Sequence, residues 1–253
     1  MTATVLFASL VILLILNVPV GIAIGLSCVV TILTFGTLSD LYVAQTLVSA
    51  TDSFPIMAIP LFILAGDLMG AGGVSRRILD VASAFFGRFT GGLAIVTVIV
   101  CMFFAAVSGS GPATVAAVGS MVIPTMLKAG YSKSFVLALV AAAGSIGVII
   151  PPSIPMVLYG VSTGTSISNL FLGGILPGLL IGAVLILYAY FYSKKMGWKG
   201  NGEKFDARKT LSLIWDAKWA LLNPVIILGG IFSGIFTPSE AAVVAVNYAM
   251  LVS

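Results

Sequence analysis

The sequence predicts an all-α integral membrane protein with an inverted repeat, a re-entrant helical hairpin and a broken helix. Three observations lead to this fold class. Hydrophobic residues make up 60% of the chain and charged residues 8%, whereas about a quarter of a soluble domain is charged. Apolar runs exceed the ~20 residues of a membrane-spanning helix and lack the alternation of barrel strands, which favours helices over a barrel. Finally, Gly, Ser and Pro cluster inside two of these runs, at SGSGPAT (108–114) and PPSIP (151–155).

The first apolar stretch, about residues 3–36, is too long for one helix and contains no polar loop. Asn17, Pro19 and Gly21 fall midway, where Pro removes a backbone donor and Gly tolerates a tight turn. We therefore expect two short helices. The chain start lacks a basic region and a cleavage site, which favours a membrane helix over a signal peptide. The expected apolar segments are 3–16, 20–36, 54–70, 91–107, 112–127, 134–150, 155–163, 167–192 and 219–233, with a last one opening near Pro238.

Basic residues lie in three stretches between the apolar segments, which predicts that all three stretches face the cytoplasm. They are Arg76, Arg77 and Arg88 in the first stretch, Lys128 and Lys133 in the second, and Lys194, Lys195, Lys199, Lys204, Arg208, Lys209 and Lys218 in the third. Because these charges are confined to loops, they report orientation rather than nucleic-acid binding, and parity puts the N-terminus outside. Asp67, near the cytoplasmic end of its segment, is expected to be interfacial, with a proton-relay acid as the alternative.

The chain must leave the cytoplasmic side after Arg88 and return before Lys128, and SGSGPAT forms the turn of that excursion. Its arms are each ~17 residues, or ~25 Å as helix, which is at or below the length needed to span a bilayer. A re-entrant hairpin over 91–127 that ends at membrane depth therefore fits better than two full spans. The following stretch, 132–163, also goes outward and is broken by PPSIP.

Non-helical backbone at membrane depth survives only against protein or a water-filled cavity, so two neighbouring breaks indicate a binding site. At the hairpin tip, free carbonyls around Ser108 and Gly109 carry the negative end of a helix dipole and suit a cation. Pro112 suits the first helical position behind a cap at Ser110 or Gly111. The free N–H groups of that second arm suit an anion.

The second break repeats this arrangement. Proline removes the donors for the carbonyls of Ile149 and Ile150, and Ser153 stands before Pro155 as the cap of the next half-helix. Hydroxyl and carbonyl oxygens without any carboxylate favour Na⁺ over a proton relay. The expected sodium ligands are Ser108, Gly109, Ser110, Gly144, Ser145, Gly147, Ile149 and Ile150, and the expected substrate-binding residues are Ser110, Pro112, Thr114, Ser153 and Pro155.

The stretch from Trp219 to Met250 repeats the layout of the chain start, with an apolar helix, a Pro-marked turn and a second apolar helix. This pairing aligns Pro19 with Pro238. The first helix starts outside and the later one starts inside, after Lys218, which is typical of an inverted-topology repeat. Because the chain stops within the last helix, we expect the first half of a longer transporter and the beginning of its second half.

A transporter subunit is the favoured function, and two alternatives remain open. One is an ion-conducting channel subunit with a re-entrant filter, although such filters normally sit on a symmetry axis of identical subunits. The other is a membrane assembly subunit without a substrate path, which has no need of two backbone breaks. Catalysis is not indicated, because the chain has no His, no phosphate-binding loop and no nucleophile elbow.

Several segments resemble the large membrane subunit (DctM-type permease) of tripartite ATP-independent periplasmic (TRAP) transporters. They include DSFPIMAIPLFILAGDLM, AAVSGSGPATVAAVGSMVIP, AAAGSIGVIIPPSIPM and GIFTPSEAA. The resemblance runs through essentially the whole chain and covers the N-terminal portion of that subunit. It implies a Na⁺-driven importer of the elevator type in the bacterial inner membrane, which carries organic anions such as C4-dicarboxylates or sialic acid. It also implies two partners, a periplasmic substrate-binding protein and a small four-helix membrane subunit.

This resemblance implies a division of the chain into fixed and moving parts. Residues 108–110 and 144–153 match the family's first hairpin and first broken helix, and thus half of the binding site. The expected parts are scaffold helices (1–70), a cytoplasmic connecting arm (71–90), a transport domain (91–163), a scaffold helix (164–192), a cytoplasmic linker (193–218) and the start of a second repeat (219–253).

Overall fold

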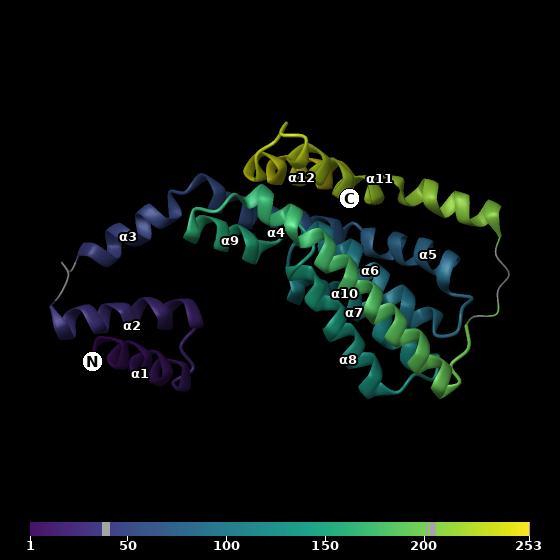
Figure 1. The fold of residues 1–253 in the computed structure, drawn as a ribbon, viewed down its shortest axis with the longest axis horizontal. Coiled ribbons are helices and arrows are strands. Elements are labelled where there is room, and N and C mark those ends of the chain that lie inside the picture. The colour runs from purple at the N-terminus through teal and green to yellow at the C-terminus, as the bar shows by residue number, and fades with distance from the viewer. Residues whose placement is uncertain (37–40, 201, 203–205, 253) are drawn as a thin grey trace. The chain divides into compact units, whose positions relative to one another are not determined.

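The computed structural model describes residues 1–36, 41–200, 202 and 206–252, apart from the side chains of residues 50 and 51. The described residues form helices joined by turns, and no strand occurs among them, in agreement with the predicted all-α class (Figure 1). They form two compact units, Met1–Ser53 and Phe54–Ser253. By length and composition, three helical stretches of the described chain can cross a membrane: Phe54–Ala71, Ile167–Met196 and Ala207–Phe232.

The first unit contains α1 (Thr2–Ile15), α2 (Val20–Phe35) and α3 (Leu41–Thr51). Helices α1 and α2 pack against each other as the predicted pair. Their turn depends on Asn17, which adopts a left-handed φ of 61°, and Pro19 is the N-cap of α2. Gly21, which we expected to relieve the turn, lies inside α2 instead. Asn serves here because its short polar side chain tolerates left-handed backbone. Helix α3 lies outside every predicted segment, because its polar residues interrupt the apolar run.

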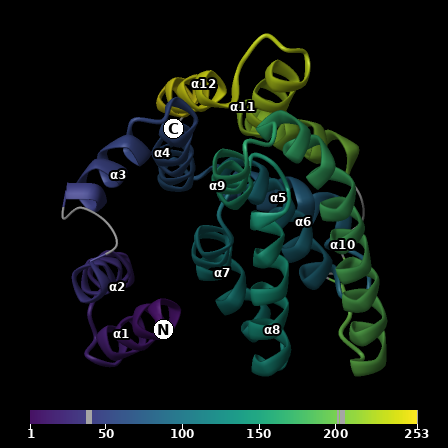
Figure 2. The same ribbon diagram turned by 60° about the vertical axis from the view of Figure 1, so that its left-hand side comes forward.

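The second unit is arranged around α6, which has thirteen of its 17 residues buried. Its elements are the 3-10 helix η1 (Phe54–Met57), α4 (Ala58–Ala71), α5 (Val74–Phe86), α6 (Gly92–Ser108), α7 (Gly111–Lys128), α8 (Lys133–Gly144), the 3-10 helix η2 (Ser145–Val148), α9 (Ile154–Thr163), α10 (Ile167–Met196), α11 (Ala207–Phe232) and α12 (Pro238–Val252). Helices α4, α5, α7, α8 and α10 pack against α6, and α4 also pairs with α12 (Figure 2). The compact units divide after Ser53, with α4 packed on α6 and α12, and the predicted boundary at residue 70 between fixed and moving parts stays a prediction.

Helix α5 occupies most of the stretch that we predicted as a connecting arm, 71–90. Its buried residues include Val74, Ile78, Val81 and Ala82, which recur at helical spacing and form one apolar face. That face packs toward α6 and α11. Helix α5 contains no long apolar run. Its sequence mixes apolar and polar residues, and only the helical spacing of the apolar ones indicates a helix.

Helices α10 and α11 extend into the predicted linker 193–218 from both ends, so that α11 begins twelve residues before the apolar segment at 219. Asp206 explains this early start. Its Oδ1 accepts hydrogen bonds from the N–H groups of Arg208 and Lys209, at 2.9 and 3.2 Å. Such a cap satisfies amides that the first turn leaves without an intrahelical partner.

The three basic stretches are joined at one end of the second unit. The N–H of Gly91, just after the first stretch, donates to the carbonyl of Trp198, in the third, at 3.1 Å. The ring of Trp198 lies 4.4 Å from that of Tyr131, in the second stretch. The residues that follow Arg88, the α7–α8 turn and the end of α10 thus meet at one end of the unit, and the side of the membrane that they face stays a prediction.

Candidate functional site

The tip of the α6–α7 hairpin is a two-residue reversal of the chain, where the sequence predicts it. Helix α6 ends at Ser108, and Gly109 follows in the left-handed region with a φ of 62°. Its N–H donates to the carbonyl of Ala105 at 2.9 Å, which closes the last turn of α6. Ser110 is extended, with φ −133° and ψ 123°, and is the N-cap of α7.

Three oxygen atoms gather beneath this tip. The hydroxyl oxygens of Ser108 and Thr114 lie 3.2 Å apart. The Thr114 hydroxyl donates to the carbonyl of Ser110 at 2.8 Å, and the Ser108 hydroxyl donates to the same carbonyl at 3.4 Å. Both hydroxyl residues are buried. We refer to Ser108 Oγ, Thr114 Oγ1 and the Ser110 carbonyl as the oxygen cluster. Thr114 was expected among the substrate groups, and the structure places it beside an expected sodium ligand.

The break after α8 lies directly against the hairpin tip. Helix α8 continues through η2, and the chain is then non-helical from 149 to 153. The N–H groups of Ile149 and Ile150 both donate to the carbonyl of Ile146, at 2.9 Å each. At the start of α9, the N–H of Ile154 donates to the carbonyl of Gly109 at 3.1 Å. A backbone hydrogen bond thus joins the two breaks.

Glycine permits this close approach at three places. A Cβ atom on Gly109 would lie 2.6 Å from the carbonyl oxygen of Pro152. A Cβ on Gly147 would lie 2.8 Å from Thr114 Oγ1, which brings the predicted ligand Gly147 against the oxygen cluster. A Cβ on Gly144 would overlap the side chain of Val115. These distances are shorter than van der Waals contact, so larger residues would push the broken segment away from the hairpin.

Three of the expected sodium ligands are not brought to the oxygen cluster. The carbonyl of Ile149 faces α10, where a Cβ on Gly174 would lie 2.5 Å from it. The side chain of Ile150 packs against Gly178 of the same helix. Ser145 is exposed, and its hydroxyl donates to the carbonyl of Ala142, one turn back, at 2.7 Å. A role of these residues in sodium binding stays a prediction.

The expected substrate residues divide into exposed and buried members. Pro112 and Pro155 are exposed in the first turns of α7 and α9. Ser110 is half-buried, and its hydroxyl accepts a 3.5 Å hydrogen bond from the N–H of Ala113, as expected of a cap. Ser153 is the N-cap of α9, but its side chain makes no capping bond. Its hydroxyl donates to the carbonyl of Val148 at 2.7 Å, because the tight loop turns that carbonyl toward it.

Two hollows flank the start of α7. A shallow groove of about 510 Å³ is lined by Pro112, Val115, Ser145 and Val148, among others. A second cavity of about 320 Å³ lies on another side of α7, between this helix and the α4–α5 corner. The sequence analysis did not predict this cavity, because it depends on α4 and α5 packing beside α7. The small residues of α4 and α7 that line it are the one sequence signal for it.

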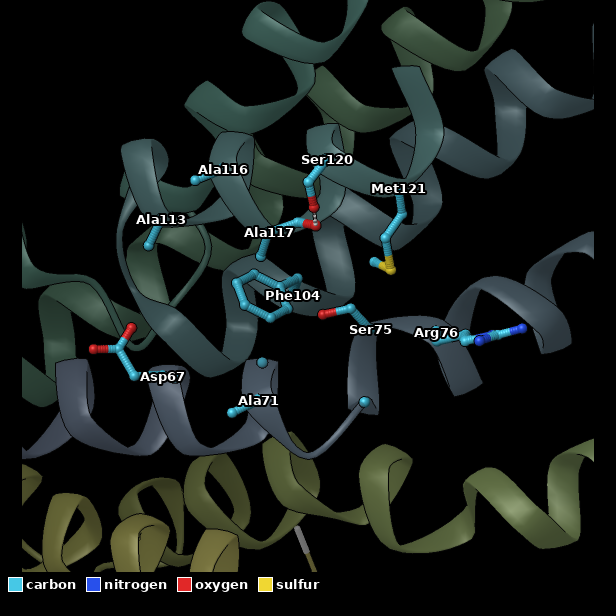
Figure 3. Close-up of a pocket in the computed structure, with 13 residues that line it drawn as sticks. Asp67, Ala71, Ser75, Arg76, Phe104, Ala113, Ala116, Ala117, Ser120 and Met121 are labelled. Carbon is cyan, nitrogen blue, oxygen red and sulfur yellow. Dashed lines mark hydrogen bonds between the residues drawn. The ribbon is translucent and has the colours of Figure 1, made fainter. Parts of the chain in front are cut away.

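Figure 3 shows Asp67 and Arg76 toward opposite ends of the second cavity, with the ring of Phe104 and the hydroxyl of Ser75 between them. Asp67 is exposed, and its interfacial role stays a prediction. The Ser75 hydroxyl is buried and has no hydrogen-bond partner among the residues that the structure describes. Among the described residues, no three His, Cys, Asp or Glu side chains gather into a metal site. The hairpin tip and the 149–153 loop offer hydroxyl, carbonyl and amide groups, and the carboxylate of Asp67 lies beside the tip, in the cavity that Ala113 also lines.

Comparison with known proteins gives a consistent result. A family model described as "Tripartite ATP-independent periplasmic transporter, DctM component" matches residues 7–253. The chain is 54% identical over 248 residues to the isethionate TRAP transporter permease protein DctMQ of Oleidesulfovibrio alaskensis, covering 98% of this chain and 39% of that protein. It is 45% identical over 262 residues to the C4-dicarboxylate TRAP transporter large permease protein DctM of Vibrio cholerae, covering 100% of this chain and 56% of that protein.

A third relative, the 2,3-diketo-L-gulonate TRAP transporter large permease protein YiaN of Escherichia coli, is 42% identical over 245 residues. The alignment covers 92% of this chain and 56% of that protein. The chain thus spans about half the length of the curated relatives that it matches.

Proposed function

Because the chain belongs to the family of DctM components of tripartite ATP-independent periplasmic transporters, we propose that it forms part of a sodium-coupled importer of small organic acids. Its role in the family is that of a membrane permease subunit, not an enzyme. The observation that carries the proposal is the buried oxygen cluster, which lies against a second break in the helical backbone. Neither feature is needed to span or to anchor in a bilayer.

The oxygen cluster supplies donors of the kind that a hard cation takes. Two hydroxyls and one carbonyl lie within 3.4 Å of one another, without a carboxylate. The C-terminal end of α6 adds roughly half an elementary charge of negative potential. Burial strengthens this attraction, since the cluster is shielded from water. In our proposal Ser108, Ser110 and Thr114 hold Na⁺, and the cation replaces the hydrogen bonds that these oxygens now make to each other.

The organic acid binds on the exposed side of the same two breaks. The starts of α7 and α9 direct N–H groups and the positive ends of their dipoles toward that side, which suits a carboxylate or sulfonate. Ser110 and the first turns at Pro112 and Pro155 provide the contacts there. The relatives named for isethionate, C4-dicarboxylate and diketogulonate support a small acid. In the longer relatives, residues beyond the part that this chain matches are proposed to supply the remaining contacts.

We place the hairpin and the broken helix in a unit that moves against a fixed frame. Helix α10, which the sequence analysis assigned to the frame, is better grouped with the moving unit. Its Gly174 and Gly178 pack against the broken segment, and Gly182 packs against Met102 of the hairpin. Disulfide cross-links between α10 and α6 should leave uptake intact. Cross-links between α10 and the predicted scaffold helices (1–70) should stop uptake.

The proposed setting is the bacterial inner membrane, with the basic stretches in the cytoplasm and an inverted second repeat completing the site. The proposed partners are a periplasmic protein that delivers the acid and a small membrane subunit. Family membership supports both partners. The test introduces cysteines at positions 195–200 and adds an impermeant thiol reagent from the periplasmic side. Labelling from that side would contradict the proposed orientation.

The test of the sodium site uses the complete transporter, with its partner subunits, reconstituted into vesicles. Thr114→Val and Ser108→Ala each remove one hydroxyl from the oxygen cluster. We expect the Na⁺ concentration for half-maximal uptake to rise about tenfold, since a lost hydrogen bond or ligand to a charge is worth about 1.5 kcal/mol. The measurement is initial uptake of a labelled acid across a series of Na⁺ concentrations.

Ser120→Ala is the matched control. Ser120 also lies on α7 and is exposed, and its hydroxyl donates to the carbonyl of Ala117 in its own helix, at 2.9 Å. This variant should keep the Na⁺ dependence of the unmodified transporter. Unchanged Na⁺ dependence in both Thr114→Val and Ser108→Ala would reject the proposed ligands. Equal uptake with a proton gradient and no Na⁺ would reject sodium coupling altogether.

A further inference from the structure

The stretches 128–133 and 194–200, at one end of the second unit, carry five lysines and no acidic residue. Lys128 and Lys133 flank the α7–α8 turn, and Lys194, Lys195 and Lys199 lie at and beyond the end of α10. All five are exposed, and none forms an ion pair with a described residue. We call these five residues the lysine patch. Its positive charge is therefore not neutralised within the described chain.

Aromatic side chains hold the two turns of the lysine patch together. The rings of Tyr131 and Trp198 are 4.4 Å apart, and those of Phe135 and Tyr192 are stacked at 4.8 Å. Tyr131 and Phe135 come from the α7–α8 side, whereas Tyr192 and Trp198 come from the end of α10. The start of α8 and the end of α10 accordingly lie at the same end of the unit in Figures 1 and 2. The lysines thus share one surface rather than two independent loops.

Helix dipoles account for only part of this charge. Lys128 lies in the last turn of α7, and Lys194 and Lys195 lie in the last turn of α10, where a cation is favourable. Lys133, by contrast, is the first residue of α8, where the positive end of the dipole disfavours a cation. The preceding Ser132 makes no side-chain cap there. The described chain therefore supplies no anion to neutralise the lysine patch.

We propose that the lysine patch binds the headgroups of anionic phospholipids. It lies at the ends of apolar helices, where headgroups meet a membrane protein, and clusters of lysine beside membrane helices bind anionic lipids. The aromatic residues at the same level support a membrane interface, since Tyr and Trp concentrate there. Tyr188, next to this cluster, is 54% exposed. The inference goes beyond the proposed transport function, because it concerns the bilayer and depends on neither Na⁺ nor substrate.

The test measures lipid retention by the complete transporter. The delipidated protein is incubated with phosphatidylglycerol or phosphatidylcholine, and the bound lipid is counted by native mass spectrometry. We expect the unmodified protein to retain phosphatidylglycerol about tenfold better than phosphatidylcholine. Replacing Lys128, Lys133, Lys194 and Lys195 by Gln together should abolish this preference. Should that variant not assemble, Lys133→Gln and Lys199→Gln should each reduce the preference severalfold.

The matched control removes four positive charges elsewhere, by Arg76→Gln, Arg77→Gln, Arg208→Gln and Lys209→Gln. It should keep the preference for phosphatidylglycerol. Equal retention by the four-lysine variant would overturn the proposal, as would an equal loss in the control. Displacement of phosphatidylglycerol by inorganic phosphate at similar concentration would point to a soluble anion instead. If the four-lysine variant lost the small membrane subunit but retained lipid as before, the lysine patch would bind a protein partner instead.

Discussion

The starts of α9 and α12 are similar in sequence and opposite in hydrogen bonding. Each places a proline in the first turn behind a hydroxyl residue, Ser153 before α9 and Thr237 before α12. At α12, Glu240 Oε2 accepts hydrogen bonds from the N–H and the hydroxyl of Thr237, both at 2.8 Å. At α9, the Ser153 hydroxyl donates away from the helix, and the Ser153 side chain accepts no hydrogen bond from the first turn.

This difference separates a structural helix start from one that is available for a ligand. The α12 start is a capping box, which completes its own hydrogen bonds and carries its own negative charge. The α9 start has no acidic residue and is fixed by its neighbour, through the bond from Ile154 N–H to the carbonyl of Gly109. An anion brought to α9 meets a positive helix end that nothing in the described chain has neutralised. The comparison therefore favours α9 as the anion-binding end.

The largest effect is expected where the hairpin holds the α9 start in place. Gly109→Ala would combine a left-handed φ of 62° with a Cβ 2.6 Å from the Pro152 carbonyl. We expect a loss of about 2–5 kcal/mol from strain and overpacking together. The measurement is thermal unfolding of the purified complete transporter.

Gly130→Ala provides the control for backbone strain. Gly130 has a φ of 84°, but no atom lies within 4 Å of its Cβ position. This variant should lose only about 1–2 kcal/mol. An equal loss for both variants would mean that contact between the hairpin and the broken segment contributes nothing.

An intermediate effect is expected from Ser153→Ala. The change leaves the carbonyl of Val148 without its donor in a partly buried loop, which costs about 1–3 kcal/mol. Thr237→Ala at the start of α12 should cost about 1 kcal/mol, as for an exposed N-cap. The two variants are compared by thermal unfolding under the same conditions. A larger loss of stability for Thr237→Ala than for Ser153→Ala would contradict this ranking of the two hydrogen-bond networks.

The smallest effect is a pH dependence confined to α12. Hydrogen bonds from the N–H and then the hydroxyl of Thr237 lower the pKa of Glu240. A carboxyl group whose pKa is lowered in the folded state stabilises the fold above its unfolded pKa of about 4.3. That stability is lost as the pH falls through the folded pKa. The stability difference between the unmodified protein and Glu240→Gln should therefore shrink below about pH 4.3.

The start of α9 supplies the control for this pH effect, because it carries no titratable group. The stability difference between the unmodified protein and Ser153→Ala should stay constant over the same acidic range. A difference for Glu240→Gln that does not change with pH would contradict the lowered pKa.

Local chemistry let the sequence predict where the helices break. The tip at Ser108–Ser110 and the loop before Ile154 follow from Gly and Pro, whose effects on the backbone act within a few residues. The pair α1–α2 was predicted for the same reason. Helix α5 was missed as an element, because its apolar face becomes visible only through its packing on α6 and α11.

The sequence by itself thus determined a helical membrane protein, its two breaks and the residue types available at them. Tertiary structure alone decided which of those groups meet. Thr114 meets Ser108 within the hairpin turn itself, six residues apart, whereas Gly147 of the broken segment reaches Thr114 only through tertiary packing. The Ile149 carbonyl turns to α10 instead, because Gly174 leaves room for it there. A hydrogen bond requires its two atoms to lie within about 3.5 Å. Contacts between segments distant in sequence set such distances, and no local pattern encodes them.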